Sequence, residues 1–278
     1  MVVAQVIDYI DTQASLGVFG TGVDFQLISQ ELRTQPSHSH RAGDPGLTSR
    51  PYPQDLWLLE SPLLPSDTLD AHLKWLGDLV APHYQFLRML KQKHEIRSYC
   101  GISIRGSGCR FRISPEALNI FVDLGIAMNL TVVFTGESQS ELDVSAEGRA
   151  EPAGAVASFE IVGKPSDVGE VASELNTLAP YVSRAAESET SAKVQQSSFW
   201  VVTAPEVGDG LDAQLIWLAS ELSPYSSFLQ SVARRVAPLV RCALRAEKDI
   251  SDQSLSPEGL SFLTSVGIPM ELDASLVA

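Results

Sequence analysis

Apolar residues recur along the chain with two different periods, one typical of strands and one typical of helices. Residues 96–104 alternate between apolar side chains on one face and mainly polar side chains, among them Arg97 and Tyr99, on the other, which predicts a half-buried strand. Residues 69–90 carry leucines at helical spacing, which predicts a long helix. Because Pro82 lacks the backbone N–H that a helix interior needs, we expect a kink there or two helices meeting at an angle.

Shorter sequence patterns predict the other helices and strands of the first half of the chain, which together form a structural unit of about 120 residues. Gly20 predicts a turn after a first strand, and Asp24 predicts the cap of the helix that follows. A polar loop comes next. The segment Ser114–Pro115–Glu116 predicts the start of another helix, because a proline and an acidic residue suit a first turn. The further expected strands are 16–19, 57–59 and 126–134.

The second half of the chain repeats the first half at an offset of 142 residues. The segment LDAHLKWLGDLVAPHYQFL from Leu69 corresponds to LDAQLIWLASELSPYSSFL from Leu211. Likewise, SPEALNIFVDLGIAMNL from Ser114 corresponds to SPEGLSFLTSVGIPMEL from Ser256. Toward the N-terminus the offset becomes 143, which one deleted residue explains. Similarity at a fixed offset indicates a tandem duplication.

The duplication predicts the fold class and the domain organisation. We expect an α+β protein with a first repeat at 1–135, an acidic linker at 136–155 and a second, diverged repeat at 156–278. Each repeat would have the order βαβαβαβ and form a four-stranded, mainly antiparallel sheet with helices packed on one face. The two repeats would pair as a pseudo-two-fold dimer within the chain, because this buries surface that one repeat alone would expose.

Charge and cysteine content restrict the partners and the compartment. The chain carries 34 acidic and 20 basic residues, a net charge of −14, which argues against general binding to nucleic acid or anionic membranes. No apolar run reaches the roughly 18–20 residues of a membrane span. The first residues, MVVAQVIDYIDTQ, lack the basic start of a secretory signal. The three cysteines, Cys100, Cys109 and Cys242, have no zinc-binding spacing, so we expect a bacterial-type cytoplasmic protein.

One polar loop is a candidate for chemistry. It carries His38, His40 and Asp44, and imidazole and carboxylate groups together suit zinc or iron. The alternative is that these are ordinary surface residues. The second repeat has Tyr181 and Ser183 where the histidines stand, so a site here would exist in one repeat only. We assign no metal and no cofactor, and His38 and His40 are the metal candidates if one binds.

An arginine and a tryptophan near this loop recur in both repeats. A guanidinium next to an indole can stack or hold an anion, although the same pair also suits a core tryptophan and an arginine bound to a nearby carboxylate. The candidate binding residues are His38, His40, Arg41, Asp44 and Trp57 in the first repeat, and Arg184, Glu187 and Trp200 in the second.

The same residues carry a resemblance to a known family. The first repeat has a characteristic set of positions: Asp24, Leu32, Pro36, Arg41, Gly43, Asp44, Trp57, Ser114–Pro115–Glu116, Leu118 and Gly125. The second repeat keeps Asp167, Leu175, Arg184, Trp200, Ser256–Pro257–Glu258 and Gly267, but departs from the pattern at Ala179 and at Ala186–Glu187. Both resemble the bacterial domain of unknown function DUF4279. The resemblance implies no reaction, because this family has no established biochemical activity.

Three functional hypotheses follow, and none assigns a catalytic residue. The first is a non-catalytic cytosolic interaction protein, because a charge of −14 would steer a basic protein partner; by analogy, its context would be immunity or toxin neutralisation. The alternative is a regulatory domain that binds a small molecule or an anion in a cleft between the two repeats, near Arg41, Asp44 and Trp57. The third is a metal-dependent enzyme that uses His38 and His40 with Asp44.

Overall fold

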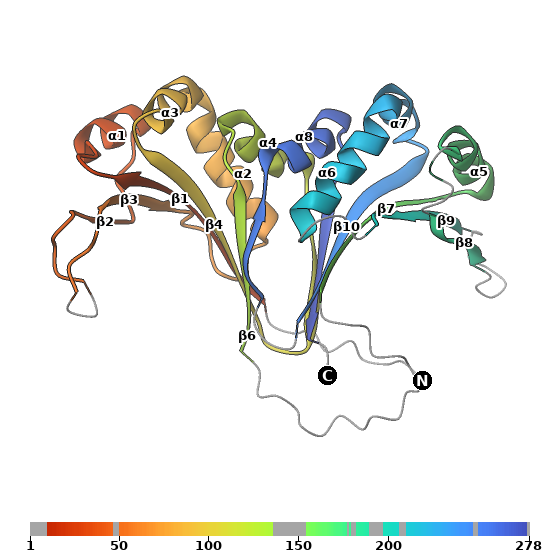
Figure 1. Ribbon diagram of the computed structural model, residues 1–278, viewed down its shortest axis with the longest axis horizontal. Helices are drawn as coiled ribbons and strands as arrows, with labels where there is room; N and C mark the ends of the chain where they lie inside the picture. Colours follow the sequence, from red (N-terminus) through yellow and green to blue (C-terminus); the bar gives the residue numbers. More distant parts are fainter. Residues whose placement is uncertain are drawn as a thin grey trace. The chain divides into compact units, whose positions relative to one another are not determined.

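The fold consists of helices packed on two mixed β-sheets, as the computed structural model in Figure 1 shows. The α+β class predicted from the sequence is therefore confirmed. The structure describes residues 10–46, 50–135, 154–176, 178, 182–188, 197–205, 210–246 and 250–276. Within this part of the chain, no helix is long and apolar enough to cross a membrane.

The two halves of the chain form their elements in the same order, which is compatible with a duplication. The first half contains β1 (Ile10–Gly20), α1 (Phe25–Leu32), β2 (His38–His40), β3 (Asp55–Glu60), α2 (Leu69–Val80), η1 (Ala81–His83), α3 (Tyr84–Lys91), β4 (Glu95–Ile104), β5 (Gly108–Ile113), α4 (Pro115–Leu124) and β6 (Met128–Phe134). The second half contains β7 (Gly154–Gly163), α5 (Pro165–Glu174), β8 (Val182–Ser188), β9 (Ser197–Thr203), α6 (Leu211–Leu222), η3 (Ser223–Tyr225), α7 (Ser226–Val232), β10 (Val236–Ala246), β11 (Ile250–Leu255), α8 (Pro257–Val266) and β12 (Met270–Leu276).

The chain divides into two compact units that exchange strands. Unit 1 comprises Met1–Gly106, Glu116–Gly136 and Asp249–Pro257, and unit 2 comprises the remaining segments. Unit 1 therefore contains β11 from the second half of the sequence, and unit 2 contains β5 from the first half. The strand order is β11-β6-β4-β1-β3-β2 in the sheet of unit 1 and β5-β12-β10-β7-β9-β8 in the sheet of unit 2.

Each sheet has six strands, so the expected number of four was wrong. The edge strand β2 consists of three polar residues without apolar alternation, and backbone pairing of His38 with Leu58 holds it against β3. The opposite edge of unit 1 is β11, which pairs antiparallel with β6. Neighbouring strands are antiparallel except β4 with β6 and β10 with β12, which are parallel. The expected pseudo-two-fold pairing of the two repeats stays a prediction.

The proline in the long helical segment marks a change of helix. The 3-10 turn η1, at Ala81–His83, separates α2 from α3 and carries Pro82 near its start. The helix α2 packs on β1, where Leu73, Leu76 and Val80 are buried. Burying such side chains provides most of the stability of a core, at about 1.5–3 kcal/mol each.

Helices cover one face of the sheet of unit 1, and among the described residues no helix covers the other face (Figure 1). On β4, the predicted apolar face, which includes Ile96 and Cys100, is buried. The other face carries Glu95, Arg97 and Tyr99, which are exposed. We call this second surface the open face of unit 1.

Candidate functional site

Asp55, which sequence reasoning did not single out, holds the predicted histidine loop in place. Its buried carboxylate accepts hydrogen bonds from the backbone N–H groups of Ala42 (2.8 Å) and Val23 (3.0 Å). It also binds the guanidinium of Arg41 at 3.1 Å. The Ala42 N–H, followed by the Val23 N–H and the guanidinium, holds the pKa of Asp55 below its usual value.

Arg41 and Asp44 are both engaged in forming this loop. Besides its ion pair, the Arg41 guanidinium donates to the carbonyl oxygen of Val23 at 2.6 Å and lies 3.6 Å from the centre of the Phe25 ring. The Asp44 carboxylate accepts from the Arg41 backbone N–H at 2.7 Å, closing a short turn. These contacts favour the structural interpretation of Arg41 and Asp44.

The two histidines lie on the edge strand β2 and contact each other. Nδ1 of His40 is 3.3 Å from Nε2 of His38, and the His40 ring stacks on Tyr52 with centres 3.5 Å apart. Desolvation, together with the neighbouring His38, lowers the pKa of His40. Among the residues that the structure describes, no group of three or more His, Cys, Asp or Glu side chains could hold a metal. Because protein zinc sites usually use three or four protein ligands, the metal hypothesis gains no support.

The two tryptophans belong to the cores of their units. Trp57 is buried, and its indole N–H donates to Oγ of Ser29 at 3.1 Å. Trp200 is buried against the edge of Phe159. Buried indoles are not available to a ligand. The backbone of β8 includes Arg184 and Glu187, but their side chains lie outside the described residues.

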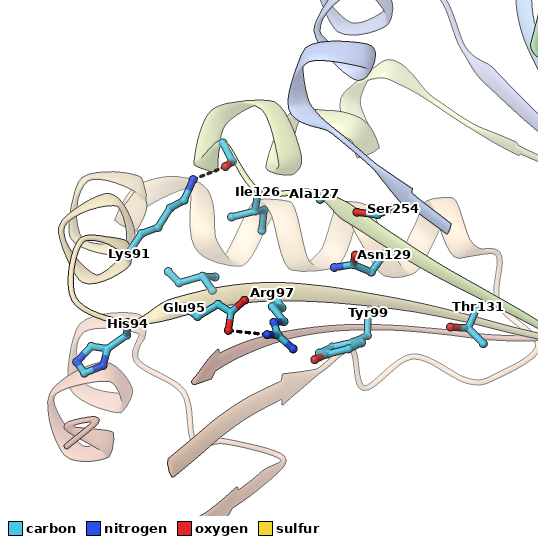
Figure 2. A pocket seen from close by; sticks show the side chains of 12 residues that line it. Lys91, His94, Glu95, Arg97, Tyr99, Ile126, Ala127, Asn129, Thr131 and Ser254 are labelled. Carbon is cyan, nitrogen blue, oxygen red and sulfur yellow. Dashed lines mark hydrogen bonds and ion pairs between the residues drawn. The ribbon is translucent and has the colours of Figure 1, made fainter. Parts of the chain in front are cut away.

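A pocket of about 690 Å³ lies elsewhere in unit 1, where β4 and β6 begin (Figure 2). Regular pairing of these strands starts at Cys100 and Leu130. Before that point Ser98 bridges them, because its hydroxyl donates to the Ala127 carbonyl at 2.8 Å and accepts from the Asn129 N–H at 3.3 Å. The polar side chains that β4, β6 and β11 contribute to the pocket are Glu95, Arg97, Tyr99, Asn129, Thr131 and Ser254, and Lys91 and His94 also line it.

A tyrosine and an arginine line one side of this pocket, and both contact the ring of Phe19. Arg97 binds Glu95 at 2.6 Å and lies 5.4 Å from the centre of the Phe19 ring. The Tyr99 ring contacts the Phe19 ring edge-on, with centres 6.1 Å apart, and 40% of Tyr99 is exposed. Hydrogen bonding to Glu95 and then to Tyr99 raises the pKa of Arg97 further, so this side chain stays charged.

A lysine fixes the rim of the pocket. The ammonium of Lys91 donates to the carbonyl oxygens of Leu124, at 3.3 Å, and of Gly125 (Figure 2). Gly125 ends α4 with a φ of +62°, a conformation that a side chain would strain. A cation at the C-terminus of a helix is also favoured by the helix dipole. The segment that starts β6 is therefore held in one position.

The corresponding face of unit 2 carries a network of ion pairs. Arg241 binds Glu160 at 3.2 Å and Glu271 at 3.1 Å. Arg110, from β5, binds Glu271 at 3.4 Å and Asp273 at 2.6 Å. Corresponding positions are aromatic, neutral or glycine in unit 1: Gly17 for Glu160, Tyr99 for Arg241, Asn129 for Glu271 and Thr131 for Asp273. The two units thus present different chemistry on the same face.

Sequence reasoning missed the pocket, although part of the signal was visible. The alternation of residues 96–104 placed Arg97 and Tyr99 together on the polar face of a strand, and an exposed aromatic residue beside an arginine is typical of a binding surface. Ser254 could not be assigned to the pocket, because it lies in the other half of the sequence. Cys100 and Cys242 are poor nucleophiles, since burial raises the pKa of each thiol to about 12.

Comparison with known proteins identifies one family. Residues 10–134 match the family described as "Domain of unknown function (DUF4279)". The match covers one copy, from β1 to the end of β6, and includes every pocket residue except Ser254. No curated protein matches the chain.

Proposed function

We propose that this protein is a non-catalytic binding protein and that the pocket of unit 1 is its small-molecule site. The observation that carries the proposal is the pocket itself, about 690 Å³ in volume, on a sheet face whose counterpart in unit 2 carries ion pairs. This volume lies in the range of about 300–1,000 Å³ found for small-molecule sites. The interpretation corresponds to the alternative hypothesis from the sequence, at a different place in unit 1.

The side chains of the pocket support recognition of a ligand. Tyr99, Thr131 and Ser254 carry hydroxyl groups that can donate and accept hydrogen bonds, and Asn129 carries an amide. Asn129 is already oriented, because its Nδ2 donates to the carbonyl of Ser98 at 3.0 Å. A side chain that is oriented before binding loses less conformational entropy when the ligand binds.

We further propose that residues 156–278 are a second, diverged copy of the domain at residues 1–135. Support comes from the sequence similarity at a fixed offset and from the shared order of elements. The copies would then have specialised, since Tyr99, Asn129 and Thr131 are uncharged in one copy, whereas their counterparts in the other form an ion-pair network. In this proposal the first copy binds the ligand, and the ion pairs of the second copy stabilise the fold.

A binding screen with a matched pair of variants tests the proposed site. Thr131→Arg places a long cation in the pocket, whereas Gln92→Arg adds the same charge on the exposed surface outside it. A small-molecule library is screened by ¹H–¹⁵N NMR and by thermal stability. We expect ligands that shift the signals of Tyr99 and Thr131, with binding lost in Thr131→Arg and kept in Gln92→Arg. Ligands that bind both variants equally would place the site elsewhere.

The net charge of −14 supports a second candidate function, binding of a basic protein partner in the cytoplasm. An immunity-type or toxin-neutralising role is the specific form of this proposal. The test is affinity capture from a lysate of the source cells at increasing salt. A stoichiometric basic partner that dissociates over a few hundred millimolar salt would support it, because screening weakens charge steering. Recovery of the protein alone would contradict it.

A further inference from the structure

Two of the basic residues that line the pocket of unit 1, Arg97 and Lys91, already have anionic or carbonyl partners. Arg97 binds Glu95 at 2.6 Å, and Lys91 binds the carbonyl oxygens that end α4. An anionic ligand would have to compete with Glu95 for the guanidinium. It would also approach a chain of net charge −14, which repels anions at long range. The charges of the pocket therefore favour a neutral ligand.

Three neutral polar side chains of the pocket are arranged to meet several hydroxyl groups at once. Asn129 and Thr131 are two residues apart on β6 and thus lie on the same face, at about 6.6 Å spacing. Ser254 lies on the neighbouring strand β11, where its register partner is Asn129. Neighbouring strands are about 4.8 Å apart. Hydroxyls and an amide at these spacings suit a molecule that carries a hydroxyl on each of several adjacent carbons.

Tyr99 offers a flat apolar surface beside these groups. Its ring is held at the edge of Phe19 and is 40% exposed. Two residues further along β4, a side chain at Gly101 would meet no atom within 4 Å, so open space lies on this face next to the ring. An aromatic face packs well against the C–H groups of a saturated ring.

We infer that the ligand of this pocket is a neutral polyhydroxylated molecule of the sugar class. Its ring would pack on Tyr99, and its hydroxyl groups would bind Asn129, Thr131 and Ser254. The Glu95–Arg97 pair adds an acceptor and a donor at the edge of the same surface (Figure 2). This inference rests on the proposed function, and the two are tested separately.

The test uses ¹H–¹⁵N NMR titrations of the full chain with defined probes. Glucose, galactose, mannose, N-acetylglucosamine and maltose represent neutral sugars, and inorganic phosphate and citrate represent anions. We expect at least one sugar to bind with a Kd on the order of millimolar or tighter, with shifts at Tyr99, Asn129 and Thr131. Phosphate and citrate should leave these signals unchanged at equal ionic strength.

Substitutions of Tyr99 distinguish the loss of ring packing against the sugar from a loss of folding. Tyr99→Ala should weaken sugar binding about tenfold or more, and Tyr99→Phe, which keeps the ring, should weaken it less than about threefold. Unchanged thermal unfolding of both variants controls for the fold. If the probe anions or other small molecules bind the pocket and sugars do not, the sugar inference is wrong while the proposed site stands. If no molecule shifts the pocket signals, both are wrong.

Discussion

Tyr99 and Arg241 occupy the same place in their two sheets. Tyr99 on β4 pairs with Ser15 on β1, and Arg241 on β10 pairs with Ser158 on β7. On this side of the strand the backbone setting is thus the same, with a serine as the cross-strand neighbour, and the side chains differ. In unit 1 the phenol ring borders a pocket, whereas in unit 2 the guanidinium joins carboxylates from two neighbouring strands.

Removing the charge of Arg241 should destabilise unit 2. Arg241→Gln leaves Glu160 and Glu271 close together without the cation that they share, and these carboxylates are 14% and 17% exposed. Because half-buried charges are screened less than exposed ones, we expect a loss of about 1–2 kcal/mol in the free energy of unfolding, measured by urea denaturation. The matched control is Arg97→Gln, whose pair with Glu95 is exposed and should contribute less than about 1 kcal/mol. Equal losses in the two variants would contradict this difference.

Asp55 should contribute to stability at neutral pH and lose that contribution in acid. Its pKa is lowered in the folded state, so its stabilisation is present above the pKa of the unfolded state and is lost as the pH falls through the folded value. Asp55→Ala leaves two backbone N–H groups without their acceptor, for an expected loss of about 3 kcal/mol at pH 7. Asp44→Ala, which removes an exposed acceptor for one N–H, should cost about 1 kcal/mol. A loss that persists unchanged at pH 3 would show that the charge of Asp55 is not responsible.

His72 should make unit 1 sensitive to mild acid. It is 1% exposed, its Nε2 lies 3.2 Å from the Leu64 carbonyl oxygen, and desolvation lowers its pKa although Leu64 and Asp67 act in the opposite direction. The unfolded chain then takes up a proton below about pH 6.5 before the folded chain does, so stability falls as the pH falls. The loss between pH 6.5 and 5.5 should be at most about 1 kcal/mol, which is reached if the folded chain stays unprotonated there.

Unit 2 supplies the matched substitution for His72. Gln214 stands at the corresponding position, accepts from the Ala157 N–H at 2.6 Å and donates to the Ala155 carbonyl at 2.9 Å. We expect His72→Gln to fold and to remove the part of the pH dependence between 6.5 and 5.5. Urea unfolding of both proteins across this range provides the measurement. An unaltered pH dependence in His72→Gln would assign it to other groups.

Local signals in the sequence predicted a large part of the fold. Strand β4 was predicted because the alternation of apolar and polar side chains is visible within the strand itself. The break at Pro82 was predicted because a proline lacks the N–H that its own helix needs. The strands β5 and β11 were missed because their partners lie in the opposite halves of the chain, and short strands carry little signal without a partner. The polar strand β2 has no apolar pattern at all.

The candidate site was harder to predict, because recurrence between the two halves was used as a sign of function. Arg41 and Trp57 recur, and the structure shows that both make contacts that hold unit 1 together. Tyr99 and Asn129 line the pocket, and neither recurs in the second half. In unit 1, the residues that recur in the second half thus stabilise the fold, whereas residues that do not recur line the pocket. Residues that differ on an otherwise equivalent face are the better guide to a ligand.

The exchange of β5 and β11 also has a consequence during synthesis on the ribosome. The first 136 residues provide most of unit 1, yet its sheet gains its edge strand β11 only when residues 249–257 have been made. Until then, the outer edge of β6 exposes backbone groups that β11 later pairs, and such edges can join to other chains. The nascent chain therefore carries an unfinished sheet through the translation of most of the second half, and a chaperone would matter most in that interval.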